Sequence, residues 1–181
     1  MVNSPIRITA GSFNIATTST SATTNAAVGN ANAKKKTGKF RAGASVSGKG
    51  KGTGDATIGL KFKHGRETKG KISVSFLFEY RDEVNIAKLP ARASAGISIL
   101  VNGQSTTVTD DRLKILGQIE NPAGGGKKLT SKTFNLMAGP GEVFEAVLVS
   151  HASATAGDQN NKGKCFSVAE GTLKLVEVRH L

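Results

Sequence analysis

Three histidines are the side chains of this sequence that could most readily serve as catalytic bases or metal ligands. They are His64, His151 and His180, and none has another metal-binding side chain two or four positions away. The sequence also contains no serine nucleophile elbow, no phosphate-binding Walker loop and no HExxH motif. We therefore expect three surface or strand-end histidines, no cofactor, and a protein that is not an enzyme.

Carboxylates in two loop-like stretches could bind a calcium ion. Asp110 and Asp111 in "TDDR" and Asp158 in "AGDQNN" are the weak metal candidates. Calcium takes six to eight oxygen ligands, and no spaced acidic motif supplies them here. The sequence thus favours ordinary turn carboxylates and no metal.

A single cysteine, Cys165, excludes an intramolecular disulfide framework and a zinc site built on cysteines. It alternates with Phe166 in "GKCFSV", as a strand residue would. This pattern indicates a small buried residue rather than a reactive thiol.

Basic side chains are the most uneven feature of the composition. The net charge is +12, and residues 34–71 contain twelve Lys/Arg against only Asp55 and Glu67. A field of one sign attracts nucleic acid, acidic polysaccharide, an anionic membrane surface or an acidic patch on a neighbouring subunit. The candidate polyanion-binding residues are Lys34, Lys35, Lys36, Lys39, Arg41, Lys49, Lys51, Lys61 and Lys63.

Aromatic residues restrict what this basic region could recognise. Nucleic-acid platforms usually combine basic residues with exposed aromatic rings. Here the phenylalanines of the region fall on strand positions that we assign to the core, and the sequence has no Trp. Sequence-specific recognition is therefore not expected, whereas non-specific contact with phosphates stays open. The Gly/Lys-rich stretch "GKGKGTG" lacks the Walker order and is interpreted as a hairpin loop.

Alternation of apolar and polar residues indicates which elements carry these side chains. The composition is rich in Gly, Ala, Ser and Thr, which favours strands and turns over long helices. Alternation predicts inward-facing residues at Phe40, Ala42, Ala44, Val46, Ile58, Leu60, Phe62, Ile72, Val74, Phe76, Phe78, Ala93, Ala95, Ile97, Ile99 and Val101. The expected fold is all-β: an antiparallel β-sandwich or jelly roll of about nine strands, with a closed barrel as the alternative.

Turn residues and changes in the alternation pattern predict where strands end or bulge. Asn102-Gly103 predicts a tight hairpin, and Gly139-Pro140-Gly141 predicts a sharp reversal. The stretch "EVFEAVLVS" is apolar on both faces at Val147, Leu148 and Val149, as in a central strand. In "EGTLKLVEVRHL" the parity changes, which a bulge between Leu175 and Val176 would explain. Only residues 83–93 suggest a helical turn, ended by Pro90.

The amino-terminal region reads as a strand followed by a polar tether. Residues 16–36, "ATTSTSATTNAAVGNANAKKK", contain too little apolar surface to order themselves, so they are expected to be disordered or a solvated, extended connection. Before them, the candidate assembly strand over residues 5–15 carries Ile6, Ile8, Ala10, Phe13 and Ile15, with a parity change at Gly11. This strand could return to its own sheet or add to the edge of a neighbour. We expect residues 1–38 to be the strand and tether, and residues 39–181 to be the sandwich domain.

A resemblance to a known class covers residues 39–181. The stretches "RASAGISILVNG", "TFNLMAGPGEVFEAVLVSHASATAGD" and "GTLKLVEV" resemble the β-sandwich domains of bacterial cell-surface and PEP-CTERM-anchored extracellular proteins. The resemblance implies an extracellular, structural role. No sorting motif, anchor helix, export signal or transmembrane segment is expected from the sequence.

Together these observations favour a structural subunit that assembles with copies of itself into a cell-surface filament, matrix or shell, through sheet edges and N-terminal strand exchange. The alternatives are a module that binds acidic polysaccharide or non-specific nucleic acid, and a viral capsid or decoration protein. The expected location is extracellular, at the cell surface or in a virion.

Overall fold

The structure is a computed structural model that describes residues 5–65, 69–101, 104–113 and 128–181, with the backbone alone for 104–113 and 128. Within those ranges every regular element is a strand. The strands are β1 (Ile6–Thr9), β2 (Ile15–Ala22), β3 (Ala27–Lys34), β4 (Lys39–Gly48), β5 (Gly50–Lys63), β6 (Gly70–Lys88), β7 (Ala91–Val101), β8 (Gln104–Leu113), β9 (Lys128–Ala138), β10 (Val143–Ala156) and β11 (Gly163–His180).

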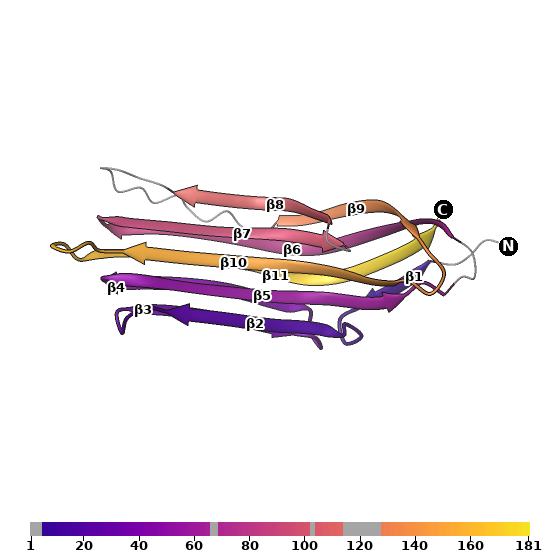
Figure 1. Cartoon of the computed structure of the whole chain (residues 1–181), viewed down its shortest axis with the longest axis horizontal. Coiled ribbons are helices and arrows are strands. Elements are labelled where there is room, and N and C mark those ends of the chain that lie inside the picture. Colours follow the sequence, from indigo (N-terminus) through magenta and orange to yellow (C-terminus); the bar gives the residue numbers. More distant parts are fainter. Residues whose placement is uncertain (1–4, 66–68, 102–103, 114–127) are drawn as a thin grey trace.

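Two antiparallel sheets confirm the predicted β-sandwich. Sheet A has the order β3-β4-β11-β6-β9, and β1 pairs with β11 beside it. Sheet B has the order β2-β5-β10-β7-β8. The strands of both sheets run along the long axis of the molecule (Figure 1). The central position of β10 confirms the prediction from its two apolar faces.

Strands β4–β11 follow the jelly-roll order. The run β4-β11-β6-β9 in sheet A is matched by β5-β10-β7-β8 in sheet B, so β4/β5, β6/β7, β8/β9 and β10/β11 each join the two sheets. The pair β2 and β3 then adds one strand to each sheet beside β5 and β4. The molecule is thus an eight-stranded jelly roll widened at one edge.

The core lies where alternation places it. All the inward positions predicted from the sequence are buried, except that Phe62 is partly buried and stacks on Phe144 with ring centroids 5.4 Å apart. Tight pairing of Val101 with Gln104 confirms the hairpin, and its turn residues 102–103 lie outside the described residues.

Beneath β2 and β3 the two sheets approach so closely that glycine is required. A Cβ atom on Gly29 of β3 would lie 1.9 Å from the backbone oxygen of Thr53 in β5. A Cβ atom on Gly54 would lie 2.2 Å from the oxygen of Asn30. Side chains cannot fit there, because backbone faces backbone. This part of the sandwich is therefore thin.

The polar segment 16–36 forms β2 and β3 instead of the expected solvated tether. Asn14 holds the start of β2, since its amide donates to the Lys61 oxygen at 2.7 Å and accepts from the Lys61 nitrogen at 2.6 Å. Beyond its end, Thr23 accepts from the Lys51 nitrogen at 2.8 Å and Thr24 donates to the Lys49 oxygen at 2.7 Å. Side-chain bonds to the β5 region therefore order a segment that has little apolar surface to bury.

The amino-terminal strand pairs within the same chain. In β1, Ile6 lies opposite Val178 and Ile8 opposite Val176, just beyond the end of the β4–β11 pairing. The parity change predicted at Gly11 is present as a turn with φ +96°, after which Phe13 is buried in the core. Ile8 packs against the core and Ile6 is half exposed, whereas Ala10 is exposed and Ile15 partly buried.

Three local predictions need correction. Residues 83–88 continue β6 instead of forming a helical turn, because Val84 and Ile86 alternate into the core. The register shift in β11 falls between Leu173 and Leu175, one residue before the predicted bulge. The turn at residues 48–50 is not a hairpin, since it joins β4 of sheet A to β5 of sheet B, and the predicted reversal at residues 139–142 likewise joins β9 of sheet A to β10 of sheet B.

Candidate anion-binding site

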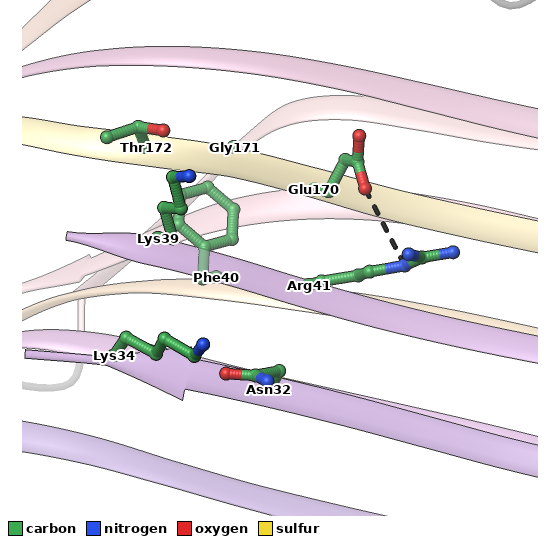
Figure 2. A pocket seen from close by; sticks show the side chains of 8 residues that line it. All are labelled: Asn32, Lys34, Lys39, Phe40, Arg41, Glu170, Gly171 and Thr172. Carbon is green, nitrogen blue, oxygen red and sulfur yellow. Dashed lines mark ion pairs between the residues drawn. The ribbon is translucent and has the colours of Figure 1, made fainter. Parts of the chain in front are cut away.

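A pocket of about 280 Å³ opens on the outer face of sheet A, where β3, β4 and β11 lie side by side. Its lining residues are Asn32, Lys34, Lys39, Phe40, Arg41, Glu170, Gly171 and Thr172. Figure 2 shows the polar side chains projecting from the three strands around the Phe40 ring.

Strand register arranges these residues in two rows. In the first row Lys34 lies opposite Lys39, and Lys39 lies opposite Thr172. In the second row Asn32 lies opposite Arg41, and Arg41 lies opposite Glu170. Alternation points all six side chains to the outer face of the sheet.

Gly171 has no side chain and so leaves room for the Phe40 ring at the base of the pocket. A Cβ atom there would lie 2.7 Å from a ring carbon of Phe40, its cross-strand partner. The Phe40 ring takes up that space and is itself 2% exposed, so it forms an apolar floor. Charged side chains rise around this floor.

Positive charge is in excess at the pocket. Glu170 is the carboxylate of the lining, and it is shared: its oxygens lie 2.6 Å from Nε of Arg81 and 3.6 Å from Nε of Arg41. Lys34 and Lys39 face each other across the β3–β4 pair, which is unfavourable for like charges. An added anion would relieve this repulsion.

The arrangement can therefore bind one anionic group. Two ammonium groups, the Thr172 hydroxyl and the Asn32 amide supply donors around the opening. Arg41 is the looser of the two Glu170 partners and could turn its planar guanidinium toward phosphate, sulfate or carboxylate oxygens.

Of the predicted polyanion-binding residues, the structure brings Lys34, Lys39 and Arg41 together at this pocket. Lys35 and Lys36 are exposed in the adjoining β3–β4 turn. The remaining four lie elsewhere: Lys49 and Lys51 at the β4–β5 turn, and Lys61 and Lys63 on β5 of the other sheet. Lys61 pairs with Glu145 at 3.0 Å. The basic region is thus divided among separate surfaces.

Sequence reasoning missed Asn32, Glu170 and Thr172 as members of the site. Asn32 lies two residues before Lys34, so strand alternation could have found it. Glu170 and Thr172 come from β11, and only the β4–β11 register places them here.

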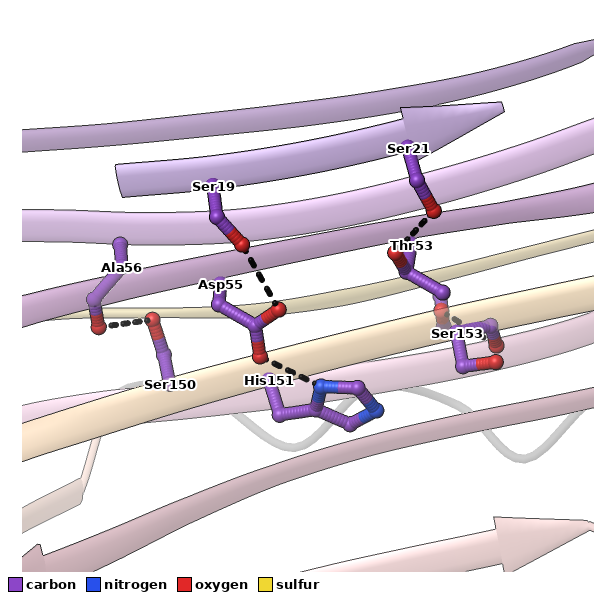
Figure 3. Close-up of polar contacts among 9 residues, drawn as sticks. Ser19, Ser21, Thr53, Asp55, Ala56, Ser150, His151 and Ser153 are labelled. Atoms are coloured by element: carbon purple, nitrogen blue, oxygen red, sulfur yellow. Dashed lines mark hydrogen bonds and ion pairs between the residues drawn. The ribbon is translucent and has the colours of Figure 1, made fainter.

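His151 and Asp55 form an exposed pair on the outer face of sheet B, with Nδ1 of His151 2.6 Å from Asp55 Oδ1. The Ser19 hydroxyl donates to the other oxygen of Asp55 at 3.3 Å (Figure 3). An activated serine must contact the histidine itself, with the carboxylate on the far side of the ring. The order of contacts here is serine, carboxylate, histidine, which does not activate Ser19.

His64 and His180 meet at the end of the core, with ring centroids 5.0 Å apart. Both stand at strand ends, as expected, but His64 is buried rather than on the surface. Its Nδ1 lies 2.8 Å from the Gly139 oxygen, and its backbone nitrogen donates to Glu142 at 2.8 Å. His64 thereby ties the β9–β10 turn to the end of β5.

Cys165 is buried in β11, in agreement with the sequence interpretation. Burial raises the pKa of its thiol, although its Sγ lies 3.3 Å and 3.4 Å from the backbone oxygens of Arg92 and Thr155. A buried thiol with a raised pKa is a poor nucleophile.

Asp158 closes its own turn. Its Oδ1 accepts from the backbone nitrogens of Asn160 and Asn161, both at 2.8 Å. These bonds and the Asn161 side chain lower the pKa of Asp158, and Lys49 adds a smaller effect. The side chains of Asp110 and Asp111 lie outside the described residues. Across the side chains that are described, no three His, Cys, Asp or Glu residues gather as metal ligands would.

Comparison with known proteins gives no family for this chain. No protein-family model matches it, and no curated protein sequence matches it. Among solved structures it is similar to "Structure of infectious bursal disease virus Gt strain", with 13% identity, a TM-score of 0.24, and coverage of 97% of this chain and 36% of that chain. The Gx strain structure gives 10% identity, a TM-score of 0.20, and coverage of 93% and 37%.

This chain therefore spans little more than a third of the length of those two chains. At such TM-scores the likeness carries no argument about function. In the described part of the chain, no helix is both long and apolar enough to cross a bilayer.

Proposed function

We propose that this protein is a structural subunit that assembles with copies of itself through the edges of its sheets. The observation that carries the proposal is the edge formed by β2 and β3, which lie one in each sheet at the same side of the sandwich. An edge strand presents unpaired backbone N–H and C=O groups to solvent, and these groups can pair with another chain.

The β2/β3 edge lacks the features with which proteins usually block such pairing. Neither strand contains proline, and the single charged residue in the two is Lys34, at the very end of β3. Pairing of β2 with β5 and of β3 with β4 proceeds without a register shift. The edge is therefore regular, and it is uncharged along almost its whole length, which favours pairing with another chain.

The jelly-roll fold indicates which kinds of assembly to consider. Jelly rolls occur in viral capsid and lectin domains, although a fold alone does not fix a function. With the resemblance to cell-surface domains, this analogy supports a filament, matrix or shell at the cell surface, outside the cell or in a virion. The amino-terminal strand pairs in its own sheet in the structure, so assembly by sheet edges does not require strand exchange.

Concentration-dependent assembly tests the proposal. Sedimentation velocity and negative-stain imaging of the purified chain should show oligomers or polymers that increase with concentration. Replacing Thr17 and Asn30 with lysine places like charges on both edge strands and should reduce assembly by tenfold or more in apparent affinity. A chain that stays monomeric at the highest concentration reached would overturn the proposal.

The matched control carries the same two added charges on the opposite side. Ser131→Lys and Asn135→Lys lie on exposed positions of β9, so they leave the β2/β3 edge unchanged. Assembly should persist in this variant. If the control alone loses assembly, the chain associates through its other edge.

A second candidate function is the binding of an anionic polymer, which the pocket at Lys34, Lys39 and Arg41 favours. Lys34→Gln with Lys39→Gln should elute from heparin at lower salt than the wild type, with a smaller salt dependence of binding. Lys61→Gln with Lys63→Gln removes the same charge from the other sheet. Equal weakening by both pairs would show that net charge, rather than the pocket, retains the protein.

A further inference from the structure

The direction of the strands limits how two copies can meet at their edges. Among the described strands, each sheet has five in the order given above, all antiparallel to their neighbours, and an odd number makes the two end strands run the same way. In sheet A these are β3 and β9, and in sheet B they are β2 and β8. Head-to-tail addition of a second copy would pair β9 with β3 in parallel, whereas all the described strand pairs are antiparallel.

An arrangement with a two-fold axis avoids this conflict. A two-fold axis perpendicular to the sheets maps each sheet onto its own continuation and reverses the strand direction. Then β3 meets β3 of a second copy in the antiparallel sense, and β2 meets β2 of that copy likewise. Antiparallel pairing gives better hydrogen-bond geometry per residue than parallel pairing.

We propose that a second copy of this chain pairs with the β2/β3 edge through such a two-fold axis, so that both sheets continue across the interface. This inference rests on the proposed function and specifies the contact that builds the assembly. The contact is isologous, because the same surface is used on both copies.

The position of the axis follows from the way β2 lies over β3. The Cβ position of Gly29 is 2.8 Å from the oxygen of Ser21, and that of Gly54, the partner of Thr20 in β2, is 2.2 Å from the oxygen of Asn30. Counting one residue further along each strand places Ala31 over Ser19. Both residues lie within one position of the middle of their strands, so a single axis through them overlaps both strands almost completely.

This register suits the side chains that it brings together. Asn30 would lie opposite Asn32 of the other copy, and in sheet B Thr17 would lie opposite Ser21. Lys34 would lie opposite Val28, which is 51% exposed in the single chain, so the lysine stem could cover it. The register keeps the two Lys34 side chains apart and sets uncharged residues against uncharged residues.

Single cysteines on β2 test both the symmetry and the register. At the axis, Ser19→Cys faces its own copy at a Cα separation of about 5 Å, which a disulfide can span. Thr17→Cys alone would lie about 14 Å from itself, since four residues of strand rise separate the two positions. In a mixture of Thr17→Cys and Ser21→Cys chains, the two different cysteines would lie opposite each other, again at a distance that a disulfide can span.

Mild oxidation followed by non-reducing electrophoresis and mass spectrometry gives the readout. We expect linked dimers from Ser19→Cys and from the mixture, but none from Thr17→Cys alone. The wild type, whose Cys165 is buried, is the control for unspecific linkage. Circular dichroism checks that each variant is folded.

Each outcome bears on the inference. If the wild type assembles but Ser19→Cys does not link, the two-fold contact is wrong while the proposed assembly stands. If Thr17→Cys links to itself, the register or the symmetry is wrong. If the wild type is monomeric at all concentrations, the inference and the proposed function fail together.

Discussion

The two edges of the sandwich differ in charge, in regularity and in the core beneath them. At the β2/β3 edge the strands carry one charged residue and pair without interruption. At the opposite edge the sequence of β8 contains Asp110, Asp111 and Arg112, that of β9 contains two lysines, and the β7–β8 pairing shifts between Ile97 and Ser98.

Charges and irregular pairing are the usual means of preventing edge-to-edge association. One edge of this protein therefore has protection that the other lacks. The interior differs in the same way, since glycines lie beneath β2 and β3, whereas β6 and β9 contribute the rings of Phe76 and Phe134 to the core. The comparison indicates that the molecule has a thin side with a nearly uncharged edge and a thick side, packed with aromatic rings, with a charged edge.

The thick side should give the largest loss of stability. Phe76 is 1% exposed and meets Phe134 edge to face, with ring centroids 6.2 Å apart. Phe76→Ala should lower the free energy of unfolding by about 3–5 kcal/mol, measured by urea denaturation, because it leaves a cavity. Phe76→Leu, which keeps most of the volume, should cost about 1–1.5 kcal/mol. Equal losses in the two variants would contradict a close-packed core on this side.

On the thin side, an added methyl group should destabilise the fold. In Gly54→Ala the new Cβ would lie 2.2 Å from the Asn30 oxygen and 2.6 Å from the Gly43 oxygen. We expect a loss of about 1–3 kcal/mol, because the sheets must separate. At Gly70 a Cβ meets nothing within 4 Å, so Gly70→Ala should change the free energy of unfolding by under about 0.5 kcal/mol. A neutral Gly54→Ala would show that the sheets have room between them.

Loss of the Asn14 amide should loosen only the β2/β3 edge. Asn14→Ala removes both hydrogen bonds to the Lys61 backbone and should cost about 1 kcal/mol. Hydrogen exchange should rise in β2 and stay unchanged in β7. Asn135→Ala, at an exposed position of β9, is the control. Uniformly faster exchange across both sheets would mean that Asn14 acts on global stability.

The smallest expected change in stability comes from the Asp158 turn, which lies outside both edges. The pKa of Asp158 is lowered from 3.8, so its charged form stabilises the folded state above that pH, and the contribution disappears as the pH falls through the lowered pKa. Asp158→Asn should therefore melt below the wild type at about pH 6, and the difference should vanish in strong acid. Gln159→Ala, which does not titrate, should show a pH-independent difference. A constant gap for Asp158→Asn would argue against the hydrogen-bonded carboxylate.

Alternation made the interior of β4–β7 predictable, since Phe40, Ile58 and Phe76 need only a period of two to be placed inward. Alternation could not predict that β2 and β3 are strands. The two strands are ordered by hydrogen bonds from Asn14, Thr23 and Thr24 to the backbone of β5 and of Lys49 just before it, which are contacts between distant parts of the chain. Local composition therefore predicts a tether in this segment, although hydrogen bonds to distant residues order it as two strands.

The pocket was predictable in part for the same reason. Lys34 and Lys39 flank a short turn, so proximity along the chain joins them. Glu170 and Thr172 enter through the β4–β11 register, which no local pattern specifies. Turn residues were also insufficient to distinguish a hairpin from a change of sheet at Gly48–Gly50 and Gly139–Gly141, because glycine and proline serve both.

The place of β11 in sheet A has a consequence for synthesis. This strand follows all the others along the chain, yet it lies in the middle of its sheet and pairs with β1, β4 and β6. A nascent chain on the ribosome cannot close sheet A until that stretch has left the exit tunnel, and such long-range pairing slows folding. Until then β4 and β6 have unpaired edges, where another chain could pair with them.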